Sequence, residues 1–190
     1  MKVGLYFGSF NPIHIGHMAI ANYMVEYSSL DQLWFIVSPH NPLKNKKTLL
    51  PEYQRLELVN RAIDSDFRFR ASNIEFNLPQ PSYTIDTLVH LTEKYPKHDF
   101  SLIIGSDNLT SFHKWKNYEI LLRDYNILVY PRPDFDETTV TNLTNVEIVR
   151  APNMEVSSSF IRKAIAEGRD VCHFMPKEVA AYVDEMNFYK

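Results

Sequence analysis

Six short runs of apolar residues alternate along this chain with segments in which apolar residues recur at helical spacing. The runs span Val3–Phe7, Leu33–Ser38, Phe67–Ala71, Ser101–Ile104, Asn126–Tyr130 and Val146–Val149. Strands that alternate with helices favour a parallel sheet, because a right-handed helical crossover returns the chain to the same end of the sheet. The pattern therefore predicts an α/β fold with a doubly wound, mostly parallel sheet.

Between these runs, apolar residues recur every three or four positions, as on the buried face of a helix. The predicted faces comprise Leu56, Val59, Ala62 and Ile63, then Ile85, Leu88, Val89 and Thr92, and later Ile161, Ala164 and Ile165. Gly168 is a suitable end for the last of these, and a final helix is expected from about Pro176, with Val179, Val183 and Met186 facing inward. The length of 190 residues suits one domain, 1–190, in which residues 157–190 form a small C-terminal helical part.

Composition and charge exclude several classes of protein. The net charge of −3 argues against nucleic acid as a partner, and no apolar run approaches the length that crosses a membrane. The single cysteine, Cys172, excludes an internal disulfide and a multi-cysteine zinc site, and it is expected to be a small buried residue. Because the first strand begins almost at Met1, no signal peptide is expected and the cytoplasm is the default location. A homo-oligomer is compatible with the sequence, which does not reveal the oligomeric state.

The junction between the first strand and the first helix carries the strongest functional signal. Residues 8–17 read Gly-Ser-Phe-Asn-Pro-Ile-His-Ile-Gly-His and precede a helix predicted at Met18–Tyr27. In an open α/β sheet, ligands bind at the carboxyl ends of the strands, and a helix N-terminus there offers free N–H groups to an anion. His14 and His17, at positions i and i+3, can face one side of this turn, while the glycines admit a phosphate close to the backbone.

Two other interpretations of His14 and His17 compete with phosphate binding. The pair could help to cap the helix, or it could bind a metal, but the five other histidines show no spacing typical of a structural zinc site. The P-loop, the Gly-x-Gly-x-x-Gly fingerprint after the first strand and the Gly-x-Ser-x-Gly nucleophile elbow are absent. Phosphate binding by this turn, which includes Gly8, Ser9 and Phe10, is therefore favoured.

A second candidate anion site lies late in the chain, where Val156–Arg162 reads Val-Ser-Ser-Ser-Phe-Ile-Arg. Three serines before an amphipathic run are a good helix start, and capping alone is one explanation for them. Arg162 follows Ser158 by about one helical turn. Serine hydroxyls, free N–H groups and a guanidinium together suit a polyphosphate. Ser157, Ser158 and Arg162 are therefore candidates for a second phosphate clamp.

Four further segments carry candidate residues whose roles the sequence alone leaves open. The N–H groups at Ser82, Tyr83 and Thr84 could hold a carboxylate or could simply be capped by the two hydroxyls. After the strand Ser101–Ile104, Gly105 and Asp107 could border a ribose, or Asp107 could cap the next helix. Trp115 is either a packed aromatic or a stacking platform. The loop at residues 39–50 carries Lys44, Lys46 and Lys47, which gain interest only beside a phosphate site.

In these residues the chain resembles the His-x-Gly-His nucleotidyltransferases, and most closely the bacterial nicotinate-mononucleotide adenylyltransferases. The resemblance spans nearly the whole chain in order. Its segments are Gly8–His17, His40–Lys44, Ser82–Leu88, Ile104–Asp107, Trp115–Leu121, Pro131–Pro133, Val156–Arg162 and Phe174–Pro176 with Tyr182. The histidine motif identifies the superfamily, while the Ser-Tyr-Thr segment and Trp115 select the narrower family. The chain departs mildly from the family pattern at Phe7, Asn11 and Ser159.

This resemblance implies a Rossmann-like fold and transfer of the AMP group from ATP to nicotinate mononucleotide, with Mg²⁺ held mainly by phosphates and water. The implied catalytic residues are His14, His17, Lys44 and Arg162. The implied ATP-binding residues are Gly8, Ser9, Phe10, His14, His17, Gly105, Asp107, Ser157, Ser158 and Arg162. The implied acceptor-binding residues are Ser82, Tyr83, Thr84, Trp115 and Arg132. Nicotinamide mononucleotide or phosphopantetheine as the acceptor, and a non-catalytic nucleotide-binding protein, are the alternatives.

Overall fold

The structure is a computed structural model that describes residues 1–39, 49–64, 66–133, 135–140 and 143–190. Its strands are β1 (Lys2–Gly8), β2 (Gln32–Val37), β3 (Phe69–Ser72), β4 (Asp99–Gly105), β5 (Asn126–Tyr130) and β6 (Val146–Ile148). Its α-helices are α1 (Ile15–Tyr27), α2 (Glu52–Ile63), α3 (Thr84–Lys94), α4 (Ser106–Leu109), α5 (Tyr118–Asp124), α6 (Ser158–Ala166) and α7 (Lys177–Glu185). Short 3-10 helices are η2 (Ile74–Asn77), η3 (Phe112–Lys114), η4 (Glu137–Val140) and η5 (Cys172–Phe174). Each of the six apolar runs overlaps one strand, and the ends differ by at most two residues.

The six strands form one parallel sheet in the order β3-β2-β1-β4-β5-β6, which confirms the predicted doubly wound α/β fold. The strands on one side of β1 run outward to β3, and those on the other side run outward to β6. The chain therefore changes direction between β1 and β4, where Leu5 is in register with Leu102. Such a switch point leaves a crevice at the carboxyl ends of the two strands, which is where ligands bind in folds of this type.

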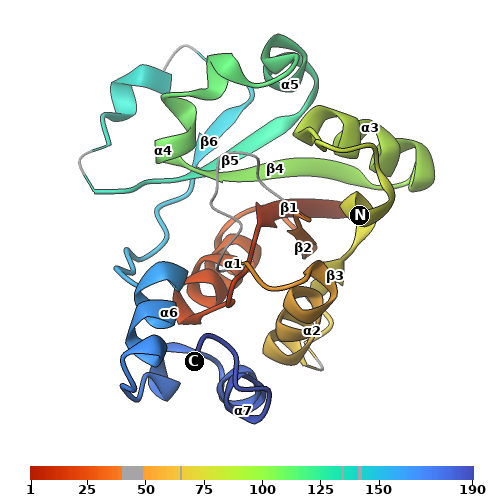
Figure 1. The fold of residues 1–190 in the computed structure, drawn as a ribbon. Coiled ribbons are helices and arrows are strands. Elements are labelled where there is room, and N and C mark those ends of the chain that lie inside the picture. Colours follow the sequence, from red (N-terminus) through yellow and green to blue (C-terminus); the bar gives the residue numbers. More distant parts are fainter. Residues whose placement is uncertain (40–48, 65, 134, 141–142) are drawn as a thin grey trace.

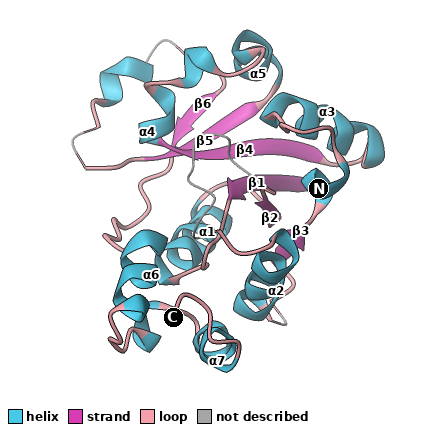
Figure 2. Ribbon diagram, in the orientation of Figure 1, coloured by secondary structure: helices cyan, strands magenta, loops and turns pink. Residues whose placement is uncertain are grey.

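Helices cover both faces of the sheet (Figures 1 and 2), with α1, α2, α6 and α7 on one face and α3, α4 and α5 on the other. Side chains alternate between the two cores with the period of two expected of strands. On β1, Val3 and Leu5 pack toward α3, whereas Tyr6 packs toward α1. Burial on both faces explains why the strands read as continuous apolar runs rather than as an alternating pattern.

The C-terminal helices pack into the same core as α1 and α2. Ile161 of α6 and Val179 and Val183 of α7 are buried there, as their spacing predicts. Gly168 ends α6 as expected, with φ of +71° and its N–H donating to the carbonyl oxygen of Ile165 at 2.9 Å. The prediction for Met186 is wrong, because α7 ends one residue earlier and leaves that side chain exposed. Phe188 enters the core in its place.

Two other expectations about burial are wrong. On α3, Val89 and Thr92 face solvent, whereas Thr87 and Leu91 are buried with Ile85 and Leu88. The helix is rotated in this way because the Thr87 hydroxyl donates to a buried carboxylate at 2.8 Å. Cys172 is exposed rather than buried, because it lies in the short η5 turn between α6 and α7. No described helix is long and apolar enough to cross a membrane.

Candidate active site

Two cavities open at the carboxyl ends of β1 and β4. The α1 cavity, of about 610 Å³, lies beside the start of α1 and α6, and the α3 cavity, of about 580 Å³, lies beside the start of α3. They share five lining residues, which are Tyr6, Phe7, Gly8, Ser9 and Tyr130. The end of β1 therefore forms a common wall, and ligands in the two cavities would meet there.

The turn after β1 is held in an unusual backbone conformation. Phe10 is buried and has φ of +44°, a left-handed value that costs energy in a non-glycine residue. Its ring packs over Gly8, where an added Cβ would lie 2.7 Å from the Phe10 Cζ atom. Only glycine fits at position 8, and the resulting turn carries the chain directly into the histidine segment.

The two histidines stack at the N-terminus of α1, with ring centroids 3.7 Å apart. The backbone N–H of His14 donates to the Nδ1 atom of His17 at 3.2 Å. An Nδ1 that accepts a hydrogen bond leaves the ring proton of His17 on Nε2. His17 is thus oriented as a hydrogen-bond donor through the far side of its ring, in the α1 cavity.

His14 is almost fully buried and lines the same cavity. Burial, aided by the positive charge of Arg132, lowers the pKa of His14 from 6.5 to about 4, so the ring is neutral near pH 7. Among the residues that the structure describes, its buried Nδ1 atom has no hydrogen-bond partner. A buried polar atom of this kind calls for a partner from a ligand or water.

The first turn of α6 faces residues 8–17, called here the histidine turn, from the other side of the α1 cavity. Ser157 caps the helix by accepting a hydrogen bond from the Phe160 N–H at 3.2 Å, so the capping explanation holds for this serine. The Ser158 hydroxyl donates to the Pro12 carbonyl oxygen at 2.8 Å, and Arg162 Nη1 donates to the Asn11 carbonyl oxygen at 2.7 Å. Ser158 and Arg162 therefore brace the histidine turn, and both also line the cavity.

Sequence reasoning missed two residues that hold this turn from behind. Arg55 of α2 has no solvent exposure and donates to the backbone carbonyl oxygens of Ser9, Ser38, Pro39 and Leu50 at 2.7–2.9 Å. Tyr189, the penultimate residue, donates its hydroxyl to Asn11 Oδ1 at 2.8 Å. An arginine in a predicted amphipathic helix is expected to be exposed to solvent. No local sequence pattern links residue 189 to residue 11. Sequence alone carried no signal for either role.

The α3 cavity contains the free N-terminus of α3. Tyr83 occupies the N-cap position without any side-chain cap, so the expected alternative of capping by Ser82 and Thr84 is not what the structure has. The Ser82 hydroxyl instead lies near the buried Glu75 carboxylate, to which the Thr87 hydroxyl donates at 2.8 Å. Burial raises the pKa of Glu75, and the hydroxyls of Thr87, Ser38 and Ser82 act in the opposite direction. The first N–H groups of α3 are left available to a ligand.

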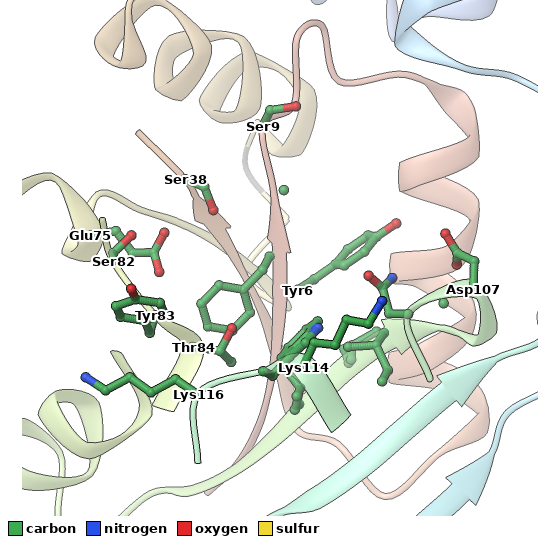
Figure 3. Close-up of a pocket in the computed structure, with 18 of the residues that line it drawn as sticks. Tyr6, Ser9, Ser38, Glu75, Ser82, Tyr83, Thr84, Asp107, Lys114 and Lys116 are labelled. Carbon is green, nitrogen blue, oxygen red and sulfur yellow. The ribbon is translucent and has the colours of Figure 1, made fainter. Parts of the chain in front are cut away.

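Figure 3 shows the side chains around the α3 cavity, with Glu75, Ser82 and Tyr83 on one side and Asp107 on the other. Trp115 lines the cavity and packs against Phe112, with ring centroids 4.9 Å apart, and it is only partly buried. It thus combines a supported ring with an accessible face, which is what a stacking platform requires.

Gly105 and Asp107, for which the resemblance implies ATP binding, line the α3 cavity, whereas Arg132, for which it implies acceptor binding, lines the α1 cavity. The Arg132 guanidinium lies 3.7 Å from the Asp107 carboxylate and joins the two cavities. Asp107 is the second residue of α4 and does not cap it. Lys44 lies outside the described residues.

The described side chains suit anions rather than a protein-bound metal. No group of three or more His, Cys, Asp or Glu among these residues could hold a metal ion, so a metal pair at His14 and His17 gains no further ligands. The α1 cavity offers serine hydroxyls, an imidazole N–H and a guanidinium to phosphate groups. The α3 cavity offers a helix N-terminus and an aromatic ring. The two together can accommodate a polyphosphate beside a second, aromatic anion.

Comparisons with known proteins agree with this arrangement. The family model described as cytidylyltransferase-like matches residues 5–164. A "Probable nicotinate-nucleotide adenylyltransferase" of Flavobacterium psychrophilum is 53% identical over 192 residues, covering 100% of both chains. A relative of the same name in Bacteroides thetaiotaomicron is 48% identical and covers 97% of this chain and 92% of its own.

A solved structure from Plasmodium falciparum has the same fold. It is described as "nicotinic acid mononucleotide adenylyltransferase complexed with NaAD", and it matches with a TM-score of 0.82 at 18% identity, covering 99% of this chain and 97% of its own. This likeness supports the Rossmann-like architecture, and the sequence relatives supply the narrower relationship. The chain belongs to the cytidylyltransferase-like family and, within it, to the nicotinate-nucleotide adenylyltransferases.

Proposed function

We propose that this chain transfers the adenylyl group of ATP to nicotinate mononucleotide, which gives the deamido form of NAD and pyrophosphate. The observation that carries the proposal is the common wall at the end of β1, where the α1 and α3 cavities meet. Dinucleotide synthesis needs two nucleotides whose phosphates converge on one point. Relatives that are about half identical over the full length carry the name of this activity.

In the proposed reaction, a phosphate oxygen of the mononucleotide attacks the α-phosphorus of ATP. A new P–O bond forms while the bond from the α-phosphorus to the oxygen bridging the β-phosphate breaks, and its electron pair leaves with pyrophosphate. The attacking phosphate is already a nucleophile, so the protein has to align the two substrates and stabilise charge rather than supply a nucleophile.

We assign ATP to the α1 cavity, with its triphosphate between the histidine turn and the first turn of α6. His17 would donate its Nε2–H to a triphosphate oxygen, and Ser157, Ser158 and Arg162 would face the same group. One N–H of Arg162 already donates to the Asn11 carbonyl oxygen, so Arg162 would both hold the histidine turn in place and bind phosphate. Lys44 stays a prediction of the sequence.

We assign nicotinate mononucleotide to the α3 cavity. The free N–H groups at the start of α3, near Tyr83 and Thr84, would receive the nicotinate carboxylate, because a helix N-terminus attracts negative charge. Trp115 would lie against the pyridine ring. Gly105 and Asp107 line this cavity and would border the ribose of the mononucleotide, near the common wall.

Mg²⁺ is expected to arrive on the triphosphate, since the described residues offer no dedicated metal cluster. Held there mainly by phosphate and water oxygens, it would neutralise phosphate charge. A cytoplasmic location stays a prediction of the sequence, with which a homo-oligomer is compatible.

A pyrophosphate-release assay with ATP and Mg²⁺ tests the proposal. Nicotinate mononucleotide should give the highest turnover in a panel with nicotinamide mononucleotide and phosphopantetheine, and the product should have the mass of the dinucleotide. His17→Ala should lower turnover by about 100-fold or more, as loss of a donor to a charged transition state does. His173→Ala is the matched control, because this exposed histidine lines neither cavity. Binding of ATP without pyrophosphate release would instead indicate a nucleotide-binding protein.

A further inference from the structure

The α3 cavity has acidic side chains around the place proposed for an acidic substrate. Glu75 lines the cavity beside the start of α3, and Asp86 lies in the first turn of that helix. An acid in the first turn of a helix partly satisfies the positive end of the helix dipole. Asp86 is therefore expected to weaken the attraction of the helix N-terminus for a ligand carboxylate. A residue with this effect is unexpected at a site for an acidic substrate.

Lys116 provides a counter-charge for Asp86 from a different segment of the chain. Its Nζ atom lies 2.8 and 3.0 Å from the two carboxylate oxygens of Asp86 and 4.8 Å from the centroid of the Tyr83 ring. Figure 3 shows the Lys116 side chain extending along Tyr83, whereas Lys114 extends toward Asp107. The ammonium group of Lys116 thus lies at the same helix end as the free N–H groups, next to the proposed stacking residue Trp115.

We propose that Asp86 and Lys116 act as an opposed pair of charges that sets how strongly the N-terminus of α3 binds the carboxylate of the acceptor. In this arrangement Asp86 weakens carboxylate binding and Lys116 strengthens it. The pair would thereby determine the preference for a nicotinate over a nicotinamide acceptor, which differ by this charge. This inference rests on the proposed function, because it concerns how that reaction selects its substrate.

The exposure of the pair limits the size of the effect. The two side chains are 43% and 47% exposed, so water and salt screen them, and the ion pair itself adds little stability. A single charge in the first turn of a helix still changes the affinity for an anion there by about two- to five-fold. The predicted sign of each change is therefore more informative than its size.

Two single substitutions separate an electrostatic role from a structural one. Asp86→Asn removes the negative charge and should lower the KM for nicotinate mononucleotide by about two- to five-fold. Lys116→Met keeps the length of the side chain, removes the positive charge and should raise that KM by a similar factor. The KM for nicotinamide mononucleotide should stay nearly constant in both variants. If the ion pair only stabilised the shape of the cavity, both variants would have a higher KM for both acceptors.

Further variants complete the test. The double variant Asp86→Asn with Lys116→Met should return close to the wild-type preference, because the two charges cancel, and Lys116→Arg should retain it. Asp184→Asn, which breaks a similar Lys–Asp pair with Lys190 near the C-terminus, should leave the preference unchanged. Thermal unfolding of each variant checks that it folds. At high salt the differences between the single variants should shrink.

Shifts of both single variants in the same direction, equal shifts for both acceptors, or an unchanged preference would each overturn the inference. These outcomes are distinct from failure of the proposed function. That failure would already be visible in the wild-type protein, as an absence of pyrophosphate release with nicotinate mononucleotide and ATP.

Discussion

At the scale of single residues, His14 and His17 differ in environment although they belong to one motif. His14 is buried with a pKa lowered to about 4, whereas His17 is only partly buried and is fixed by a backbone hydrogen bond. The His14 ring also limits position 16, where an added Cβ would lie 3.1 Å from His14 Nδ1. The motif therefore places one neutral imidazole behind one oriented donor, with a glycine between them.

The lowered pKa of His14 predicts how stability depends on pH. Between pH 6.5 and about 4, the unfolded chain binds a proton at this histidine that the folded chain does not bind. The contribution of His14 to the free energy of unfolding is therefore fully present above pH 6.5. As the pH falls toward 4, the free energy of unfolding decreases by up to about 3 kcal/mol.

Urea unfolding of the wild type and of His14→Gln at several pH values measures this contribution. The free energy of unfolding of the variant should fall less steeply between pH 6.5 and 4 than that of the wild type. His173→Gln, a change at an exposed histidine, should keep the wild-type slope. Parallel curves for the wild type and His14→Gln would contradict the assigned pKa.

At the scale of elements, α2 supports the site through one buried cation. The guanidinium of Arg55 binds the carbonyl oxygens of Ser9, after β1, and of Ser38, after β2, and those of Pro39 and Leu50. Its burial lowers its pKa, and the four carbonyl oxygens compensate for the lost hydration. The ends of β1 and β2 are thus held together by a helix that contributes no residue to either cavity.

Replacement of Arg55 by Met should lower the free energy of unfolding by at least about 3 kcal/mol, because several buried carbonyl oxygens lose their donors at once. Arg55→Lys should recover only part of this loss, since an ammonium group cannot reproduce the planar spread of donors. Urea unfolding measures both values. Arg61→Met is the comparison on the same helix, where a half-exposed salt bridge with Glu57 should contribute less than about 1 kcal/mol. Equal losses at positions 55 and 61 would refute this role of Arg55.

The elements themselves were predictable because their signals are local. Apolar runs located all six strands, and the run of three serines from Ser157 and the glycine at Gly168 predicted where α6 begins and ends. The orientation of α3 was not predictable, because Thr87 turns inward toward a carboxylate twelve residues away. The role of Arg55 was also hidden, since its partners are backbone atoms brought together only by the folded chain. Local patterns locate elements, and long-range contacts decide which polar residues are buried.

At the scale of the whole molecule, the C-terminal part of the chain completes a site that the N-terminal turn begins. Ser158 and Arg162 bind the carbonyl oxygens of Pro12 and Asn11, and Tyr189 binds the Asn11 side chain across 178 positions of sequence. Residues 157–190 therefore share both a core and a site with the first strand and helix. This sharing supports the proposal that the chain forms one domain, with the helical part as an integral component.

The contact between Tyr189 and Asn11 leads to a prediction about one substrate only. Asn11 lines the α1 cavity and not the α3 cavity, so a loosened Asn11 should affect ATP more than the acceptor. Tyr189→Phe removes the hydroxyl that donates to Asn11 Oδ1 and should raise the KM for ATP by about five-fold, the effect of one hydrogen bond to a buried acceptor. Steady-state kinetics with each substrate varied in turn measures the two KM values.

Tyr182→Phe is the matched control for this prediction. Tyr182 lies on α7 and contacts the Arg61 guanidinium through its ring face, which phenylalanine retains, so its KM values should equal those of the wild type. Equal increases in the KM for ATP and for the acceptor in Tyr189→Phe would mean that the C-terminus stabilises the molecule in general. A selective increase for ATP would mean that the last residues of the chain position the turn that binds the first substrate.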